Sequence, residues 1–541
     1  MADVNTHKRI GETAYTFRYF PQQSPILINY LARRANVAAP AVDAPFTYLD
    51  LGCGNGITAN TLAAASPKSR FFGVDHLPEH IANARGVAEA GELENITFIE
   101  SSFRNLAEHD LPQFDFIALH GIYSWVSEAE RSDIRDVIDK HLKPGGLVYV
   151  SYNALPGSAV LDPMRDLIKQ YTDAISGSPR EKAAEAIKFL TNLQENDARY
   201  IKDNPVVSAT IDDMRDRNIN YVAHEYLTEH YQSFSIKTVA AEMAEKSLKY
   251  CCGVTQGPAW IRRSQLRKFR YLLSSRSTQL AKDNLTGILL NESFRADIYC
   301  RPDHERVDGM SPKTFMTSTF GATNLLPQLH PPSRNLNSEA DMILQIVSPG
   351  KADMQTCAET PEMQMHSPDR LHEFVHYMVE DQFLYPFANK AVEPVEATVN
   401  TDNDEEEKAD APKEQEAETQ ISWYIVSGYN RFILKNRLLR TGRCALASPV
   451  IGDGVVIDLI TGVFLLALTE APDEDPVKFS DRSLKTSGRQ WLHKSIPVVD
   501  PAERKALLTE DHADFMEKRL PLLVRLGIVE SQVIPDNDSP D

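Results

Sequence analysis

Short apolar runs alternate with longer amphipathic stretches over the first 152 residues of the chain. The pattern predicts helices near Thr58, over 79–90 and over 127–141, and strands at 48–51, 70–75, 96–100, 114–120 and 147–152. Such alternation is typical of a parallel sheet that is covered by helices. We therefore predict a doubly wound α/β fold, in which a ligand binds beyond the carboxyl ends of the strands.

The first predicted strand ends in a glycine-rich turn, Asp50-Leu51-Gly52-Cys53-Gly54-Asn55-Gly56. Glycines lack the Cβ atom that would keep a ligand away from the backbone, and they tolerate a positive φ. The helix that follows adds unpaired N–H groups and a partial positive charge. The turn therefore predicts a cofactor site. A dinucleotide fingerprint would need its third glycine where Ile57 stands, so that cofactor class is excluded.

The order acid-x-Gly-x-Gly-x-Gly resembles the first motif of class I S-adenosylmethionine (SAM) methyltransferases. The resemblance implies that Asp50 faces the amino group of the methionine moiety, which a carboxylate attracts. Asp75, at the end of the second strand, can accept hydrogen bonds from a ribose diol. Ser102 and Phe103 occupy the adenine slot, where the superfamily often has an acid. The expected cofactor contacts are Tyr15, Asp50, Gly52, Cys53, Gly54, Asn55, Gly56, Asp75, His76, Ser102, Phe103 and His120.

Six further stretches resemble a bacterial group of SAM methyltransferases that carry a methyltransferase regulatory domain. These stretches are 120–126, 151–157, 221–227, 248–253, 294–301 and 446–450. The group resembles rickettsial-type protein lysine methyltransferases. The resemblance implies methyl transfer to a lysine of a protein substrate. The alternatives are a small-molecule methyltransferase, or a SAM-binding regulatory or interaction protein without turnover.

A class I sheet has seven strands, and five are predicted before residue 153. A helix at 236–247 and a strand at 248–252 fit the sixth strand, and 295–301 fits an antiparallel seventh. We expect the regulatory-domain-like segment, 215–305, to complete this Rossmann-like sheet. Residues ~155–235 would then form a helical insertion over the active site. The predicted methyltransferase core therefore spans residues 1–305.

Smaller α+β modules are predicted beyond residue 305. In the middle module, 306–392, a helix at 371–381 begins after Ser367-Pro368-Asp369, and a short strand at 383–385 follows. The C-terminal domain, 420–541, combines an apolar stretch at 456–468, a helix at 511–526 and the apolar residues 527–529. We predict that both the middle module and the C-terminal domain are winged-helix-like. Between them lies a linker, 393–419, whose residues 401–419 contain nine acids and two lysines.

Composition limits the partners and the compartment. The net charge of −19 makes nucleic acid an unlikely partner and suits a lysine-bearing protein surface. No apolar run reaches the ~18 residues that span a bilayer, and the N-terminus lacks the apolar stretch of a signal peptide. Six cysteines without a CxxC pattern suit the reducing cytoplasm. We expect a cytoplasmic protein that binds no membrane, and association into a homodimer stays open.

The chemistry requires in-line alignment of acceptor, methyl group and sulfur, and an unprotonated acceptor amine. The catalytic candidates lie where the fourth and fifth strands end: Tyr123, Trp125, Tyr152 and Asn153. Ordinary packing is the alternative for the aromatic residues. The segment 15–25 resembles the lid over SAM in this superfamily, and a packing patch at a helix start is the alternative.

One further motif suggests a different chemistry. His372-Glu373-Phe374-Val375-His376 matches H-E-x-x-H, which on a helix can place two zinc ligands on one face. The match includes no convincing third ligand, although Glu393 or Glu396 could be proposed. Because the same residues form a plausible core stripe, we favour a structural helix and assign no metal.

Overall fold

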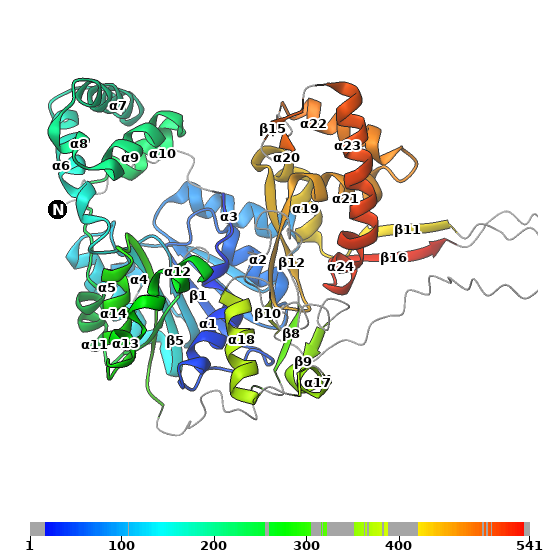
Figure 1. The fold of residues 1–541 in the computed structure, drawn as a ribbon, viewed down its shortest axis with the longest axis horizontal. Helices are drawn as coiled ribbons and strands as arrows, with labels where there is room; N and C mark the ends of the chain where they lie inside the picture. The colour runs from blue at the N-terminus through cyan, green and yellow to red at the C-terminus, as the bar shows by residue number, and fades with distance from the viewer. Residues whose placement is uncertain are drawn as a thin grey trace, which may run out of the picture.

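The structure is a computed structural model (Figure 1). It describes residues 17–106, 108–254, 259–303, 315, 318–321, 351–361, 363–364, 367–380, 384–387, 420–488, 492–493, 496–498 and 500–534.

A seven-stranded sheet forms the centre of the methyltransferase part. Its order is β3-β2-β1-β4-β5-β7-β6, and β7 runs antiparallel to both of its neighbours. The strands are β1 Thr47–Leu51, β2 Arg70–Asp75, β3 Ile96–Glu100, β4 Phe114–Leu119, β5 Leu142–Asn153, β6 Lys249–Gly253 and β7 Phe294–Cys300. The predicted α/β fold with a Rossmann-like seven-stranded sheet is confirmed. The segment after residue 215 supplies the last two strands, and β6 lies beyond β7 instead of directly against β5.

Helices cover both faces of this sheet. On one face lie α1 Pro25–Arg34, α2 Ile57–Ala65 and α3 Pro78–Ala90. On the other face lie α4 Phe103–Leu106, α5 Glu128–His141 and α11 Ile236–Ala244. The strands alternate accordingly, because Tyr48 packs with the α1 face whereas Leu49 packs with the α5 face.

Helix α5 agrees with the sequence pattern, whereas the strand after it begins earlier than predicted. Helix α5 begins as predicted, because Ser127 and Glu130 form a reciprocal capping box. Strand β5 begins at Leu142, five positions before the predicted strand at 147. The register with β4 shifts between Phe114 and Phe116, so residues 142–146, which precede the predicted strand, form an irregular part of β5.

A helical lobe leaves the sheet at the end of β5. It consists of α6 Asp162–Asp173, α7 Pro179–Glu195, α8 Arg199–Lys202, α9 Pro205–Asp216 and α10 Ile219–Tyr226, after the short 3-10 turn η2 Ala159–Leu161. The lobe has an apolar cluster of its own and stands apart from the sheet at the upper left of Figure 1. Its entry and exit lie together, because Ala154 and Phe234 form a parallel bridge. The expected helical insertion is therefore present.

Between β6 and β7 lie α12 Ala259–Leu266, η3 Arg267–Phe269, α13 Arg270–Ser274 and α14 Gln279–Leu289. Beyond β7, the strands β8 Thr319–Gly321, β9 Lys351–Asp353 and β10 Tyr385–Pro386 form a small sheet beside α17 Met354–Glu359 and α18 Pro368–Glu380. Helix α18 begins where predicted, because Ser367 Oγ accepts a hydrogen bond from Arg370 N at 3.3 Å. Tyr30 of α1 packs edge-on against Phe320 of β8, so this module joins the α1 face.

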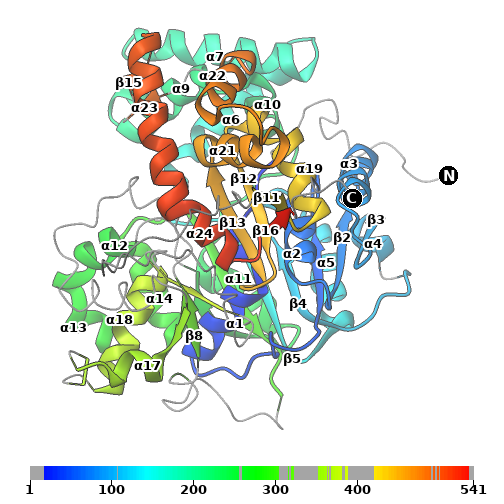
Figure 2. The ribbon, with the colours of Figure 1, turned by 90° about the vertical axis from the view of Figure 1, so that its right-hand side faces the viewer.

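The C-terminal part packs on the outside of α2 and α3. Strands β12 Arg443–Ser448 and β13 Asp453–Asp458 contact α2, and α19 Gly428–Asn436 contacts α3 (Figure 2). The other elements are β11 Gln420–Ile425, α20 Leu438–Thr441, α21 Leu459–Glu470, α22 Pro476–Thr486, β14 Leu492–His493, β15 Ile496–Pro497, α23 Pro501–Asp514, the π-turn η4 Phe515–Arg519, α24 Leu520–Arg525 and β16 Val529–Ile534. The assignment as a winged helix stays a prediction.

The apolar stretch 456–468 is divided between a strand and a helix. Strand β13 ends at Asp458, whose carboxylate caps α21 by accepting a hydrogen bond from Thr461 N at 2.7 Å. Helix α21 is thus buried in the C-terminal core. Among the described residues, no helix combines the length and the apolar character needed to cross a membrane.

Candidate cofactor and acceptor site

The glycine turn after β1 has the geometry that its sequence predicts. Gly52, Gly54 and Gly56 have φ values of 76°, 55° and 67°. Gly56 is the N-cap of α2, and a Cβ atom there would lie 2.6 Å from the Cβ of Ala84. Glycine is therefore required at this position both by the backbone conformation and by the close approach of α3.

Asp50 is a buried carboxylate at the end of β1. Burial, and secondarily the charge of Asp75, raises its pKa to about 7. Within the part of the chain that the structure describes, no group donates a hydrogen bond to this carboxylate. A buried carboxylate of this kind is stabilised by a cation. The residue thus fits the expected ammonium group of SAM.

Asp75 is also buried, but it is surrounded by donors. Its carboxylate accepts hydrogen bonds from Gly54 N and Leu77 N, both at 3.0 Å, and lies 3.3 Å from His80 Nδ1. Burial raises the pKa of Asp75, yet hydrogen bonding and charge from His80 outweigh it and hold the pKa below its ordinary value. The carboxylate is therefore ionised at neutral pH. Since a carboxylate offers about four acceptor positions, it can also accept from a ribose diol.

The remaining expected cofactor residues surround these two acids. His76 Nδ1 lies 3.6 Å from Asp75, and Asn83 donates a hydrogen bond to Asn55 Oδ1 at 3.0 Å. Ser102 caps α4 by accepting from Asn105 N at 3.3 Å, and it is exposed. Phe103 is half-buried, and burial raises the pKa of the Cys53 thiol. Tyr15 lies outside the described residues.

Aromatic rings gather beside this site, around His120 at the end of β4. The ring centroid of His120 lies 4.2 Å from that of Phe20, 5.8 Å from that of Phe294 and 5.9 Å from that of Tyr149. His120 Nδ1 and the Tyr149 hydroxyl share a hydrogen bond of 2.9 Å. Burial, with a contribution from Arg18, lowers the pKa of His120 to about 4. The imidazole is therefore neutral at pH 7 and does not repel a cationic methyl donor.

Asn153 ends strand β5 next to this aromatic cluster. It pairs with Phe294 across β5 and β7, and its backbone N–H donates to Ser124 Oγ at 2.8 Å. Its side-chain Nδ2 is buried and forms no hydrogen bond within the described structure. A buried amide group without a partner costs free energy, so it suits a ligand that brings one.

Tyr123 and Tyr152 point to the opposite face of the sheet. The Tyr123 hydroxyl donates to Glu242 and accepts from Arg135 Nη1 at 3.2 Å. The Tyr152 hydroxyl donates to Asp297 Oδ2 at 2.5 Å. Both side chains are fully buried in the cluster on the α5 side. The structure therefore does not bring these two hydroxyls together with His120 and Asn153.

Trp125 faces the helical lobe. Its ring lies 5.0 Å from that of Tyr231, and the guanidinium of Arg165 lies 5.2 Å from the Trp125 ring. Arg165 also lies over Tyr231 at 4.0 Å and pairs with Glu225 at 2.7 Å. Trp125 thus joins the loop after β4 to the lobe through cation–π contacts.

The N-terminal segment covers the site and is fastened by distant residues. Phe20, whose ring packs against that of His120, donates its N–H to Thr58 Oγ1 at 3.1 Å. The preceding residue, Tyr19, donates its hydroxyl to Asp453 of β13. Tyr385 of β10 donates to the same carboxylate, whose pKa is raised by burial. No local sequence signal marks Asp453, because its partners lie far away along the chain.

A cavity of about 630 Å³ lies beside this junction. Apolar side chains of α1, α19 and β13 line it, together with Arg18, Arg437 and Arg443. Tyr19 lines the cavity, whereas the ring of the next residue, Phe20, packs against that of His120. The N-terminal segment therefore lies between the cavity and the aromatic cluster.

The H-E-x-x-H helix packs into the middle module. The His372 ring lies 4.3 Å from that of Phe315, and His376 Nε2 lies 3.1 Å from Glu380. Among the described residues, no group of three or more His, Cys, Asp or Glu side chains could hold a metal ion. Glu393 and Glu396 lie outside the described residues.

Two family profiles match the chain. The first, described as "Methyltransferase domain", matches residues 43–203. The second, described as "Predicted methyltransferase regulatory domain", matches residues 218–301. The second match contains β6 and β7, so the segment that is described as a regulatory domain completes the seven-stranded methyltransferase sheet.

Relatives extend the similarity along the chain. Uncharacterized protein sll1526 of Synechocystis sp. (strain ATCC 27184 / PCC 6803 / Kazusa) is 26% identical, over 96% of this chain and 98% of that protein. Uncharacterized protein RP028 of Rickettsia prowazekii (strain Madrid E) is 30% identical over 187 residues, which are 34% of this chain and 72% of that protein. The chain belongs to the SAM-dependent methyltransferases that join a methyltransferase domain to a methyltransferase regulatory domain. It is an enzyme, and SAM is its cofactor.

Solved structures show how far the fold extends. PKMT2 from Rickettsia typhi superposes with a TM-score of 0.60, and its complex with AdoHcy with a TM-score of 0.61. Each match covers 95% of this chain and 99% of that chain at 18% sequence identity. The likeness establishes a common fold that includes the middle and C-terminal parts.

Proposed function

We propose that this methyltransferase transfers the methyl group of SAM to a lysine side chain of a protein substrate. The observation that carries the proposal is the aromatic cluster around the neutral His120, beside the unpartnered amide of Asn153. A lysine ε-amine has an ordinary pKa of about 10.4, and it must be neutral to attack the methyl group. Burial among aromatic rings disfavours the ammonium form and so favours the reactive amine.

Each side of the proposed site has a separate role. Asp50 would hold the amino group of SAM, the turn from Gly52 to Gly56 its carboxylate end, and Asp75 its ribose. Ser102 and Phe103 would border the adenine. These assignments rest on the burial of Asp50, on the ionised state of Asp75 and on the positive φ values of the turn.

On the acceptor side, Asn153 is the proposed partner of the amine. An amide can present either its oxygen or its nitrogen after rotation, so this side chain can accept a hydrogen bond from the amine. The hydroxyls of Tyr123 and Tyr152 are bonded to Glu242 and Asp297 on the opposite face of the sheet, so they would not contact the amine. These two residues would instead hold the ends of β4 and β5 in position. Trp125 would set the position of the lobe relative to the loop after β4.

Two further findings support a protein acceptor. Six stretches of the sequence resemble a bacterial group that is itself similar to rickettsial-type protein lysine methyltransferases, and the fold is shared with PKMT2 over nearly the whole chain. The aromatic cluster lies at the carboxyl edge of the sheet, and the lobe is attached to the same edge through Ala154 and Phe234. The lobe could therefore contact a large acceptor.

The test is transfer from radiolabelled SAM to a bacterial lysate, followed by mass spectrometry of the labelled product. We expect label in protein, and methylated lysine in the labelled peptides. The Asp50→Ala variant is the matched control and should leave the lysate unlabelled. Label confined to small metabolites would instead identify a small-molecule enzyme. SAM binding without transfer would indicate a regulatory protein.

A further inference from the structure

The segment between β6 and β7 is strongly basic in an acidic chain. Residues 254–282 contain seven Lys or Arg and no Asp or Glu, whereas the net charge of the chain is −19. We call residues 262–276 the basic arm. It comprises the part of α12 from Arg262 onward, η3, α13 and the two residues after it.

The sheet topology attaches this arm at the carboxyl edge of the sheet, where β5 ends and the proposed acceptor site lies. β7 is antiparallel to both β5 and β6, so the chain leaves β6 at Gly253 and enters β7 at Phe294 on the same edge of the sheet. Phe294 pairs with Asn153 and contacts the ring of His120. The arm is therefore attached at the edge where the cofactor turn and the proposed acceptor site lie.

Two of its arginines anchor the arm to the protein. Arg262 forms an ion pair with Glu292. Arg263 lies 3.4 Å from Glu380 and 4.4 Å from the Tyr377 ring centroid, so it connects the arm with α18. These contacts fix the position of α12 next to the middle module.

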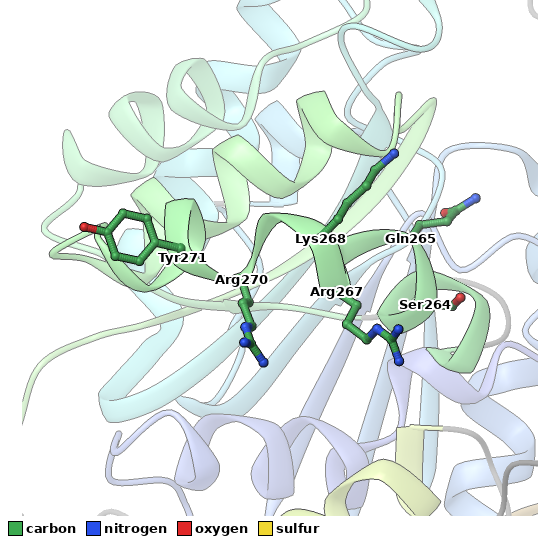
Figure 3. A pocket seen from close by; sticks show the side chains of 6 residues that line it. All are labelled: Ser264, Gln265, Arg267, Lys268, Arg270 and Tyr271. Carbon is green, nitrogen blue, oxygen red and sulfur yellow. The ribbon is translucent and has the colours of Figure 1, made fainter.

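Three other cations of the arm are exposed. Arg267, Lys268 and Arg270 form no ion pair with any residue that the structure describes. In Figure 3, Arg267 and Arg270 point to the same side of the arm, and Lys268 points to the other side. They line an open pocket of about 780 Å³ together with Ser264, Gln265 and Tyr271. Clustered like charges repel one another, and an anionic partner relieves that repulsion.

Apolar groups are exposed beside these charges. Tyr271 is 81% exposed and Leu272 is 46% exposed. Arginine and aromatic side chains are enriched at protein–protein interfaces, where a ring supplies contact area and a guanidinium supplies directed hydrogen bonds. The surface therefore has both components of a protein-binding site.

We propose that the basic arm docks an acidic stretch of the protein whose lysine is methylated; this inference rests on the proposed function. The exposed cations supply charge complementarity and steer the encounter. Tyr271 and Leu272 supply the apolar contact. A protein is favoured over nucleic acid as the occupant because Tyr271 and Leu272 add exposed aromatic and aliphatic contact area to the cations, as at protein–protein interfaces. The substrate class is thus a protein with acidic residues near the target lysine.

The test uses the full chain with saturating SAM and two fluorescent peptides. One peptide is rich in Glu and Asp and has a central lysine, and the other has Gln and Asn in the same places. Binding is measured by fluorescence anisotropy over a range of NaCl concentrations. The arm variant is Arg267→Glu/Arg270→Glu. The matched control is Arg180→Glu/Lys237→Glu, which makes the same change in net charge at exposed positions of α7 and α11.

We expect the parent to bind the acidic peptide more tightly than the neutral one, and the affinity to fall as salt rises. The arm variant should bind the acidic peptide about tenfold more weakly, and the control should bind it like the parent. Unchanged SAM affinity in both variants would show that they are folded. Equal weakening in the two variants would overturn the proposal, as would equal binding of the two peptides.

Two further outcomes identify the ligand of the arm and distinguish a failure of the docking proposal from a failure of the proposed function. A single-stranded oligonucleotide that binds more tightly than the acidic peptide, and is lost in the arm variant, would assign the arm to nucleic acid and overturn the proposal. Conversely, arm-dependent peptide binding without lysine methylation in any lysate protein would leave the docking surface standing. In that case only the proposed function would fail.

Discussion

The hydroxyl of Tyr19 donates a hydrogen bond to the buried carboxylate of Asp453, 434 residues further along the chain. Tyr385 donates to the same carboxylate from the middle module. Since Phe20 follows Tyr19 and packs against His120, the segment over the proposed acceptor site is fastened by the C-terminal part. Three regions that are distant in sequence thus meet at one buried acid.

Tyr19→Phe removes one donor to Asp453. The buried carboxylate then loses part of its hydrogen bonding, which should cost about 1–3 kcal/mol of the free energy of unfolding. Urea unfolding would measure this loss, and calorimetry should show weaker SAM binding. Tyr424→Phe is a suitable control, because its hydroxyl bonds to Glu530 on the surface, and it should unfold like the parent. If both variants behave alike, the junction does not stabilise the protein.

The affinity for SAM should depend on the ionisation of Asp50. Its pKa in the free protein is about 7, and the ammonium of SAM prefers the carboxylate form. Affinity should therefore rise with pH up to about 7 and level off above it, with a limiting slope of about one log unit per pH unit below. Isothermal titration calorimetry from pH 5.5 to 8.5 would measure this profile. Asp50→Asn should bind weakly with no such rise, and a rise in that variant would exclude Asp50 as its cause.

Asp50 should also affect the stability of the SAM-free protein. Between an unfolded pKa of about 4 and a folded pKa of about 7, the native state binds the proton more tightly than the unfolded state. Stability therefore falls as pH rises through this window, by up to about 4 kcal/mol, and is constant above it. Asp50→Asn lacks this penalty. Urea unfolding without SAM should find the variant more stable than the parent at pH 8, with a smaller difference at pH 5.

Gly56→Ala tests the cofactor turn. The positive φ and the close Ala84 and Phe98 atoms should together cost about 2–5 kcal/mol. Gly86→Ala on α3 is the matched control, because no atom lies within 4 Å of its Cβ position. That change should stabilise the helix by about 0.5–1 kcal/mol. Thermal unfolding of both variants would show opposite shifts. A neutral Gly56→Ala would contradict the described geometry.

Asn153→Ala tests the proposed acceptor contact. If the amide positions the amine, kcat should fall at least about tenfold while the dissociation constant for SAM is unchanged. Steady-state kinetics on the methylated substrate, with calorimetry for SAM, would separate these effects. Tyr152→Phe is the comparison, because its hydroxyl bonds to Asp297 on the other face. We expect Tyr152→Phe to lower the free energy of unfolding and to leave kcat nearly unchanged. A large loss of kcat with unchanged stability would instead place the Tyr152 hydroxyl at the acceptor site.

The sequence predicts the part of the fold that depends on local pattern. The strands of the sheet follow from short apolar runs, and the turn at 52–56 follows from its glycines and from Asp50. The alternation of side chains along a strand explains why the prediction of the acceptor site was less accurate. Tyr152 and Asn153 are neighbours on β5, so they face opposite sides of the sheet and cannot share one site. If this alternation is applied to the end of β5, the sequence alone assigns Tyr152 and Asn153 to opposite faces.

Long-range features could not be found in this way. Asp453 is one acid among many in the sequence, and only the folded chain places Tyr19 and Tyr385 on it. The basic arm is not apparent from the composition, because the net charge of the whole chain outweighs the six cations of residues 262–276. A count of charge along a sliding window would have revealed the arm, but not its place at the catalytic edge.

The bridge between Ala154 and Phe234 closes the helical lobe at its base. The lobe has its own apolar cluster and is joined to the sheet by two adjacent strands of chain. It therefore has the anatomy of an exchangeable cassette. A lobe closed in this way can be exchanged for that of a relative while the glycine turn and its two acids keep their places in the sheet.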